Sequence, residues 1–194
     1  MKRAIALLEK HNLLKIISDE LDINLEIPHI AYVEVKRPDS KAILFTNVVD
    51  RKNSKKFKEP VLMNVFCNED AVKLFIGDGD KIGSEIESLL KLKPPVTFSE
   101  KLSTLGKLFS LKNTIPKKIK GKGICQEVIK LGADAKLSDL PVIKTWEDDG
   151  GAFITMGQVY TQSLNGELKN LGMYRLQVFP DNTLGMHWQI HKDS

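Results

Sequence analysis

The stretch NLGMYRLQVFPDNTLGMHWQIHKDS, residues 170–194, has the pattern of a β-hairpin and decides how the second half of the chain folds. Two extended runs, MYRLQVF and GMHWQIH, flank the turn-like segment PDNT. Because alternate residues of a strand share a face, each run has one apolar side and one side that is polar at its centre. The polar sides carry planar donor and acceptor groups with the geometry of a recognition site: Arg175, Gln177, His187, Gln189 and His191.

The register of this hairpin decides whether the two polar sides meet. A turn centred on Asn182 would place Arg175 opposite Gln189 on a shared face. A turn centred between Asp181 and Asn182 would shift the pairing by one residue and separate the two polar sides. The sequence leaves both registers open, and a polar face turned to water remains the alternative to a site.

Upstream of the hairpin, short extended runs continue back to residue 125. The runs CQEVI and AFITMGQVYTQS are divided from their neighbours by turns such as EDDGG and LNGE. This alternation is typical of an antiparallel sheet or a small barrel. The acidic segment WEDDGG, residues 146–151, is interpreted as a solvated turn rather than a metal site.

The first part of the chain alternates between predicted helices and strands, which gives the whole an α+β class. Helical spacing covers residues 3–21, 80–92 and 99–112. The segment LEIPHIAYVEVKRPDS is ambiguous between a strand and a helix with Pro28 in its first turn. The segments KAILFTNVV and PVLMNVFC are typical of buried strands. Asn68 is a good N-cap for the helix EDAVKLFI that follows. We place a boundary near residue 120, between an N-terminal α/β domain (1–120) and the antiparallel part (121–194).

Composition indicates a globular, cytoplasmic protein. Hydrophobic residues make up 42% and charged residues 28% of the chain, and no apolar run reaches the length of about 20 residues that spans a bilayer. The N-terminus begins like a signal peptide, but Glu9 and Lys10 interrupt its apolar run too early. Cys67 and Cys125 lack zinc spacing and are expected to be two reduced, buried thiols.

Basic residues are concentrated in two clusters, although the net charge is only +4. Residues 51–58 hold five positive charges, and residues 101–122 hold seven lysines and no acid. Each cluster has a single phenylalanine and little arginine, which argues against nucleic-acid binding. We interpret the clusters as solvated faces, with peripheral contact to the anionic inner membrane surface as the weaker alternative.

Three segments together, TWEDDGGAFITMGQVYTQ, NLGMYRLQVF and MHWQIHKD, resemble the UbiD family of decarboxylases, the 3-polyprenyl-4-hydroxybenzoate carboxy-lyases. The resemblance is strong over residues 125–194 and weaker upstream, at AILFTNVV and PVLMNVF. It implies the N-terminal portion of such an enzyme, with an α/β domain followed by a truncated, flavin-binding split β-barrel. It further implies prenylated FMN, Mn²⁺ or another divalent metal, and K⁺ as cofactors.

The implied activity is non-oxidative decarboxylation of aromatic carboxylic acids, with polyprenylated 4-hydroxybenzoates of quinone biosynthesis as the expected substrates. A flavin prenyltransferase would supply the cofactor, and the full-length protein would form a homo-oligomer. Nucleic acid is not an expected partner.

The resemblance also assigns individual residues. Asn170 and His191 correspond to metal ligands, and Arg175 corresponds to the arginine of the family's catalytic acid–arginine network. The residues implied to contact the cofactor are Met173, Tyr174, Arg175, His187, Trp188, Gln189, Lys192 and Asp193. For Tyr174 and Trp188, core packing of the sheet is the alternative role.

The family's third metal ligand, a glutamate, and its two catalytic acids lie downstream of the motif IHKD. We therefore expect these 194 residues alone neither to decarboxylate nor to retain the cofactor well. Two other functions stay open: a non-catalytic flavin- or metal-binding barrel module, and a basic surface-binding protein that uses the two lysine-rich clusters.

Overall fold

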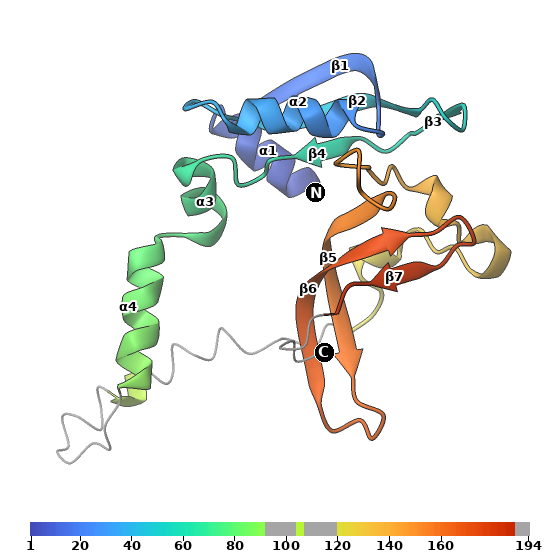
Figure 1. Cartoon of the computed structure of the whole chain (residues 1–194). Helices are drawn as coiled ribbons and strands as arrows, with labels where there is room; N and C mark the ends of the chain where they lie inside the picture. The colour runs from blue at the N-terminus through green and yellow to red at the C-terminus, as the bar shows by residue number, and fades with distance from the viewer. Residues whose placement is uncertain (92–103, 107–119, 189–194) are drawn as a thin grey trace. The chain divides into compact units, whose positions relative to one another are not determined.

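A computed structural model describes residues 1–91, 104–106 and 120–188 of the chain and shows a mixed α+β fold with two sheets (Figure 1). Contacts divide the chain into a unit of Met1–Phe75 with Ala135–Ser194 and a unit of Ile76–Asp134. The predicted α+β class is confirmed. The two described sheets do not close into a barrel, and the boundary near residue 120 stays a prediction.

The first sheet is built around one strand that is buried along most of its length. This central strand, β2 (Ala42–Asp50), pairs in parallel with β1 (Leu14–Asp22) and antiparallel with β3 (Lys55–Lys56) and β4 (Val61–Met63). Its sequence AILFTNVVD supplies β-branched and aromatic side chains to both faces, which suits a strand with neighbours on each side. The strand predicted from PVLMNVFC is present but is limited to β4.

The helix predicted over residues 3–21 is wrong beyond its first half. Helix α1 ends at Lys10 (Lys2–Lys10), and Asn12 has a left-handed backbone with φ of 57°. The chain then enters β1, where Ile16 pairs with Leu44 of β2. Pairing with the buried central strand outweighs the helical spacing of the leucines, because the spacing alone gives no tertiary partner.

The main core lies between the first sheet and helix α2 (Glu26–Val35), which carries Pro28 in its first turn, so the helix is the correct one of the two alternatives for this segment. Ile27 of this helix and Phe45 of β2 are fully buried in one cluster, which also includes Ile143. The segment around Ile143 is tied to the same unit, since the backbone N–H of Lys144 donates to the carbonyl of Ile23 at 3.1 Å. This attachment fixes the start of the turn that follows at residue 146.

The basic cluster at residues 51–58 is partly neutralised by acids. Three of its members form ion pairs: Arg51 with Glu26, Lys55 with Asp139 and Lys56 with Glu20. The backbone N–H of Asp22 and the Arg51 guanidinium together hold the pKa of Glu26 below its ordinary value. Such pairs lower the attraction of this cluster for an anionic surface. Most of the second cluster lies outside the described residues.

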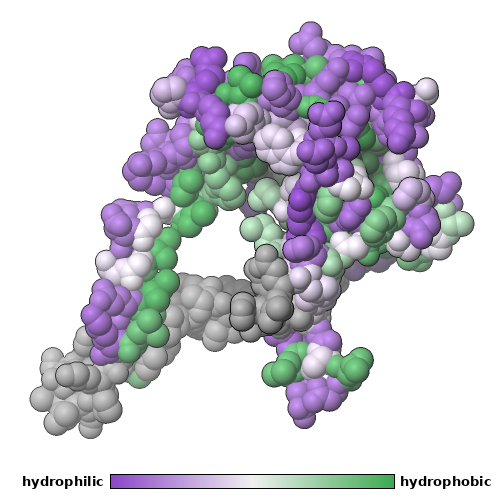
Figure 2. Space-filling view, in the orientation of Figure 1, coloured by the Kyte–Doolittle hydropathy of each residue, from purple (hydrophilic) through white to green (hydrophobic). Residues whose placement is uncertain are grey.

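Two further helices follow the first sheet. In α3 (Glu69–Ile76), Asn68 accepts a hydrogen bond from the backbone N–H of Ala71 at 2.9 Å, which confirms it as the N-cap. Helix α4 (Gly79–Leu90) is capped by Asp78 and has no buried residue. Figure 2 shows apolar groups in a line along one side of α4. The helix predicted over 99–112 lies largely outside the described residues.

Short 3₁₀ turns occupy the region where the strand CQEVI was predicted, so that prediction is wrong. Turn η2 (Ile124–Gln126) stands there, followed by η3 (Gly132–Asp134) and η4 (Leu137–Asp139). Burial raises the pKa of the Cys67 thiol, as expected for a buried cysteine, but Cys125 is exposed, which corrects its predicted burial. No helix in the described part of the chain has the length and apolar character needed to cross a lipid bilayer.

The second sheet is antiparallel, in the order β5–β6–β7 (Figure 1). Strands β5 (Phe153–Gln162) and β6 (Lys169–Val178) form a long hairpin, with an irregularity in β5 between Ile154 and Gly157. Strand β7 (Leu184–Met186) is shorter than predicted from GMHWQIH. The expected antiparallel character of this half is therefore confirmed.

Candidate functional site

The hairpin of β6 and β7 has a register that differs from both registers considered from the sequence. Leu176 pairs with Met186, and Gln177 pairs with Gly185, so the turn is centred on Asp181. The next residue, Asn182, has a left-handed backbone with φ of 65°, which closes the turn. Relative to a turn centred on Asn182, every partner moves by two residues, and a shift by two keeps each side chain on its face.

Because of this register, the two polar sides meet as far as the structure describes them. Arg175 lies opposite His187, whose backbone N–H donates to the carbonyl of Arg175 at 3.5 Å. On the other face, the rings of Tyr174 and Trp188 lie with centroids 5.8 Å apart. Four predicted site residues lie outside the described residues: Gln189, His191, Lys192 and Asp193.

Arg175 is held by a carboxylate that the sequence analysis did not select. Its Nη2 donates to Oδ2 of Asp149 at 2.8 Å, and its Cζ lies 3.7 Å from the centroid of the Phe153 ring. The side chain of Asp149 is 14% exposed, and that of Arg175 is 42% exposed. A cation over an aromatic face and beside a mostly buried carboxylate is restricted in orientation.

The turn that carries Asp149 is fixed from both ends. The Asp149 Oδ2 atom accepts a second hydrogen bond, from the backbone N–H of Trp146 at 3.2 Å. The Trp146 ring meets the Tyr32 ring of α2 edge-on at 5.4 Å, and Gln177 Nε2 donates to the carbonyl of Gly150 at 2.9 Å. Residues 146–151, which we name the acidic turn, are thus an ordered support for β6.

The interpretation of the acidic turn as solvated is right for two of its acids and wrong for the third. Glu147 and Asp148 are exposed, whereas Asp149 points to Arg175. Three consecutive acids before two glycines give no sign of which one faces the sheet. The partner becomes evident only when Gln177 is found opposite Phe153, which brings the acidic turn beside β6.

Asn170 lies on the opposite face of β6 from Arg175, because the two are five positions apart, an odd number, along a regular strand. Its Nδ2 donates to the Tyr174 hydroxyl at 3.3 Å, and Tyr174 is buried. The structure therefore does not bring the predicted metal ligand and the predicted catalytic arginine together. Met173, with 64% exposure, shares the face of Arg175.

The described residues contain no group of three or more histidine, cysteine or acidic side chains that could hold a metal. Of the two predicted metal ligands, Asn170 is described by the structure, and His191 lies outside the described residues. The assignment of both residues as metal ligands stays a prediction.

Gly172 allows Tyr174 to lie along the strand toward Asn170. A Cβ at position 172 would come within 2.4 Å of Cε2 of the Tyr174 ring. We expect Gly172→Ala to lower the free energy of unfolding by about 2 kcal/mol, because the buried ring must leave its place. Urea unfolding followed by Trp fluorescence measures this, since Trp188 contacts the displaced ring.

Gly83→Ala in α4 is the matched control, because a Cβ there meets nothing within 4 Å. That change should leave stability equal or raise it by about 0.5–1 kcal/mol, through higher helix propensity. Equal effects of the two substitutions would contradict the role given to Gly172.

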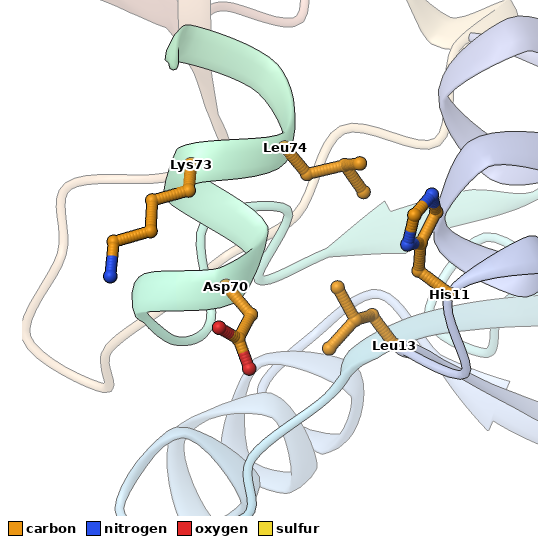
Figure 3. A pocket seen from close by; sticks show the side chains of 5 residues that line it. All are labelled: His11, Leu13, Asp70, Lys73 and Leu74. Atoms are coloured by element: carbon orange, nitrogen blue, oxygen red, sulfur yellow. The ribbon is translucent and has the colours of Figure 1, made fainter. Parts of the chain in front are cut away.

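A hollow of about 390 Å³ lies at the end of α1, the start of β1 and α3 (Figure 3). Its lining residues are His11, Leu13, Asp70, Lys73 and Leu74. The Leu74 side chain points toward His11, whereas Lys73 points the other way (Figure 3). None of these residues belongs to the predicted site, so the hollow has no part in the candidate site on β6.

Two domain families match the chain, one in each half. The 3-octaprenyl-4-hydroxybenzoate carboxy-lyase N-terminal domain matches residues 5–90, and the Rift-related domain of the same carboxy-lyase matches residues 117–194. Both belong to UbiD, and together they cover most of the chain.

Curated relatives are similar along the whole chain. An uncharacterized protein of Helicobacter pylori is 47% identical over 199 residues, covering 100% of this chain and 32% of that protein. One of Aquifex aeolicus is 40% identical over 189 residues, covering 96% of this chain and 37% of that protein. The chain thus spans about a third of the length of the curated relatives it matches.

Solved structures of UbiD-class enzymes share the fold. The apo 3,4-dihydroxybenzoic acid decarboxylase of Klebsiella pneumoniae matches with a TM-score of 0.65 and 21% identity, over 99% of this chain and 37% of that one. An evolved dimeric form of HmfF from Pelotomaculum thermopropionicum, in complex with prFMN, matches with a TM-score of 0.62 and 20% identity, over 97% and 38%. With the two domain matches in consecutive order, the chain belongs to the UbiD family of decarboxylases, of which it carries the N-terminal and Rift-related domains.

Proposed function

We propose that this chain is the N-terminal part of a prenylated-FMN-dependent decarboxylase that acts on 4-hydroxybenzoate-type aromatic acids, including polyprenylated ones, in quinone biosynthesis. The observation that carries the proposal is the shared polar face of β6 and β7, where Arg175 lies opposite His187. Solved enzymes of this fold include decarboxylases of vanillic and 3,4-dihydroxybenzoic acid and HmfF bound to prFMN or FMN, which supports an aromatic acid and a flavin.

The donor set of this face fits an anionic, planar group. Arg175 supplies a permanent positive charge, Gln177 and His187 supply further polar groups, and Met173 adds exposed apolar surface. Prenylated FMN, when bound, supplies the electron sink for the electron pair left by the departing CO₂. Arg175 would hold a carboxylate by two parallel hydrogen bonds and orient it, and the proton that replaces CO₂ would come from acids outside this chain.

The proposed metal site includes Asn170 on β6. Asn170 offers an amide oxygen, which suits Mn²⁺ or K⁺, but it faces Tyr174 rather than Arg175. We propose that Asn170 and His191 bind the metal when the remaining ligand, a glutamate from elsewhere in the full-length protein, completes the site.

Several broader expectations join this proposal. The sheet β5–β6–β7 would be the first part of a split barrel, which begins near residue 121. The full-length protein would be a cytoplasmic homo-oligomer that receives its cofactor from a flavin prenyltransferase and contacts the inner membrane at most peripherally.

Co-expression of the full-length protein with a flavin prenyltransferase tests the function. We expect the purified protein to show absorption of the modified flavin and to release CO₂ from 4-hydroxybenzoate or a related acid. The 194-residue chain alone is the control and should show neither. A full-length protein that binds flavin without turnover of any aromatic acid would point instead to a binding module.

A further inference from the structure

We propose that Asp149 is the positioning residue of Arg175: it fixes the orientation of the guanidinium without touching the substrate. The inference rests on the proposed function for its consequence in catalysis, but its structural part stands on the contacts of the acidic turn. The sequence alone indicates Arg175 as a site residue but gives no sign of its contact with Asp149.

The Asp149 carboxylate is itself held in place. Asp149 Oδ2 accepts from the Trp146 backbone N–H and from Arg175 Nη2, at 3.2 and 2.8 Å. The backbone hydrogen bond places the carboxylate whether or not the arginine is present. A carboxylate that is ordered in advance can direct a flexible arginine at little further cost in entropy.

The Arg175 guanidinium has two supports of different kinds. The Phe153 ring lies under its Cζ at 3.7 Å, and Asp149 binds one edge through Nη2. The aromatic ring fixes the plane of the guanidinium, and the hydrogen bond to Asp149 fixes its rotation within that plane. An exposed arginine with neither support would sample many rotamers.

The contact with Asp149 leaves other N–H donors of Arg175 available. An arginine has five N–H donors, and within the described residues only the Nη2 contact with Asp149 uses them. The guanidinium can therefore hold Asp149 and a second anion at the same time. The Arg175 side chain is 42% exposed and that of Asp149 is 14% exposed, so an incoming anion can reach the guanidinium while Asp149 stays covered.

Loss of Asp149 should thus affect turnover more than substrate affinity. Removing its negative charge raises the attraction of Arg175 for a second anion, so KM should stay equal or fall. The loss of orientation should lower kcat about tenfold, because the reacting groups are less often in a productive geometry. A purely structural defect would instead raise KM and lower kcat together.

Chemical modification tests the contact without any catalytic activity. This chain has four arginines. In the full-length protein, the rate at which phenylglyoxal modifies each of these four can be followed by mass spectrometry of its peptides. We expect Asp149→Asn to make Arg175 react several-fold faster. Arg37 and Arg51, paired with Asp39 and Glu26, are internal references whose rates should not change.

Two further variants complete the design. Asp148→Asn makes the same charge change one residue away, at an exposed position, and should leave both the Arg175 rate and kcat as in the wild type. Asp149→Glu keeps the charge and should restore part of kcat.

The outcomes separate the two proposals. An unchanged Arg175 rate in Asp149→Asn would overturn the positioning role, whatever the activity. Suppose instead that phenylglyoxal modifies Arg175 faster in Asp149→Asn than in the wild type, but the full-length wild-type protein releases no CO₂ from any aromatic acid. That result would support the contact between Asp149 and Arg175 and contradict the proposed function.

Discussion

Arg175→Ala should lower the rate of decarboxylation by the full-length protein about 10³-fold, a typical cost of removing a charged or polar group that stabilises the reacting centre. Arg175 is the permanent cation on the polar face of β6, and it already binds one carboxylate at 2.8 Å. Alanine removes the charge and the five donors at once. The measurement is CO₂ release from a 4-hydroxybenzoate by cofactor-loaded protein.

Arg175→Lys distinguishes charge from geometry. A lysine keeps the positive charge but cannot form two parallel hydrogen bonds to a carboxylate, so it should restore only a small part of the lost rate. Arg37→Ala is the matched control, since Arg37 also pairs with an acid, Asp39, but lies outside the second sheet. Its rate should equal that of the wild type.

The Arg175→Ala result also has a built-in check on folding. The hydrogen bond from the Trp146 backbone N–H to Asp149 does not involve Arg175, so we expect the acidic turn to stay ordered in the variant. A modified-flavin spectrum like that of the wild type would show that the site still forms. Activity close to the wild type would refute a role for Arg175 in the reaction.

Phe45→Ala should lower the free energy of unfolding by about 3–5 kcal/mol, the usual cost of emptying a buried aromatic position. Phe45 is fully buried at the centre of β2, in the cluster with Ile27 and Ile143. Its loss leaves a cavity between the first sheet and α2. A drop of this size is comparable with the total stability of many domains.

Urea unfolding followed by circular dichroism measures the Phe45 effect, and low soluble yield would be a second sign. Ile16→Ala in the adjacent strand β1 is the control, because Ile16 is 56% exposed. It should cost less than about 1 kcal/mol. Similar losses in both variants would mean that the core lies elsewhere.

Much of the fold followed from patterns that are local in sequence. The strand AILFTNVVD was predictable because branched side chains run along all of it, and Asn68 was predictable as a cap because its role involves only the next three residues. β1 was not predictable, since the helical spacing of its leucines ignores a partner strand 28 residues away, at Ala42 for Leu14. Tertiary pairing decided that segment.

The candidate site divides in the same way. Strand alternation alone placed Arg175 with Gln177 and apart from Tyr174. In the structure Arg175 and Gln177 both contact the acidic turn, whereas Tyr174 contacts Trp188. The contact between Arg175 and Asp149 joins segments 26 residues apart, and the sequence of neither segment indicates that the two are in contact. The cofactor and metal assignments came from resemblance, and they stay proposals for the residues of this chain.

The turn centred on Asp181 sets a parity rule for this hairpin. Lengthening or shortening the connection by one residue turns β7 over, so that Trp188 would take the place beside Arg175 and His187 would face Tyr174. Changing the length of the connection by two residues shifts the register of β7 but keeps each of its side chains on the same face of the sheet. Insertions or deletions in this loop should therefore change its length by two residues. A change by an odd number would place Trp188, in place of His187, on the face of the sheet that carries Arg175.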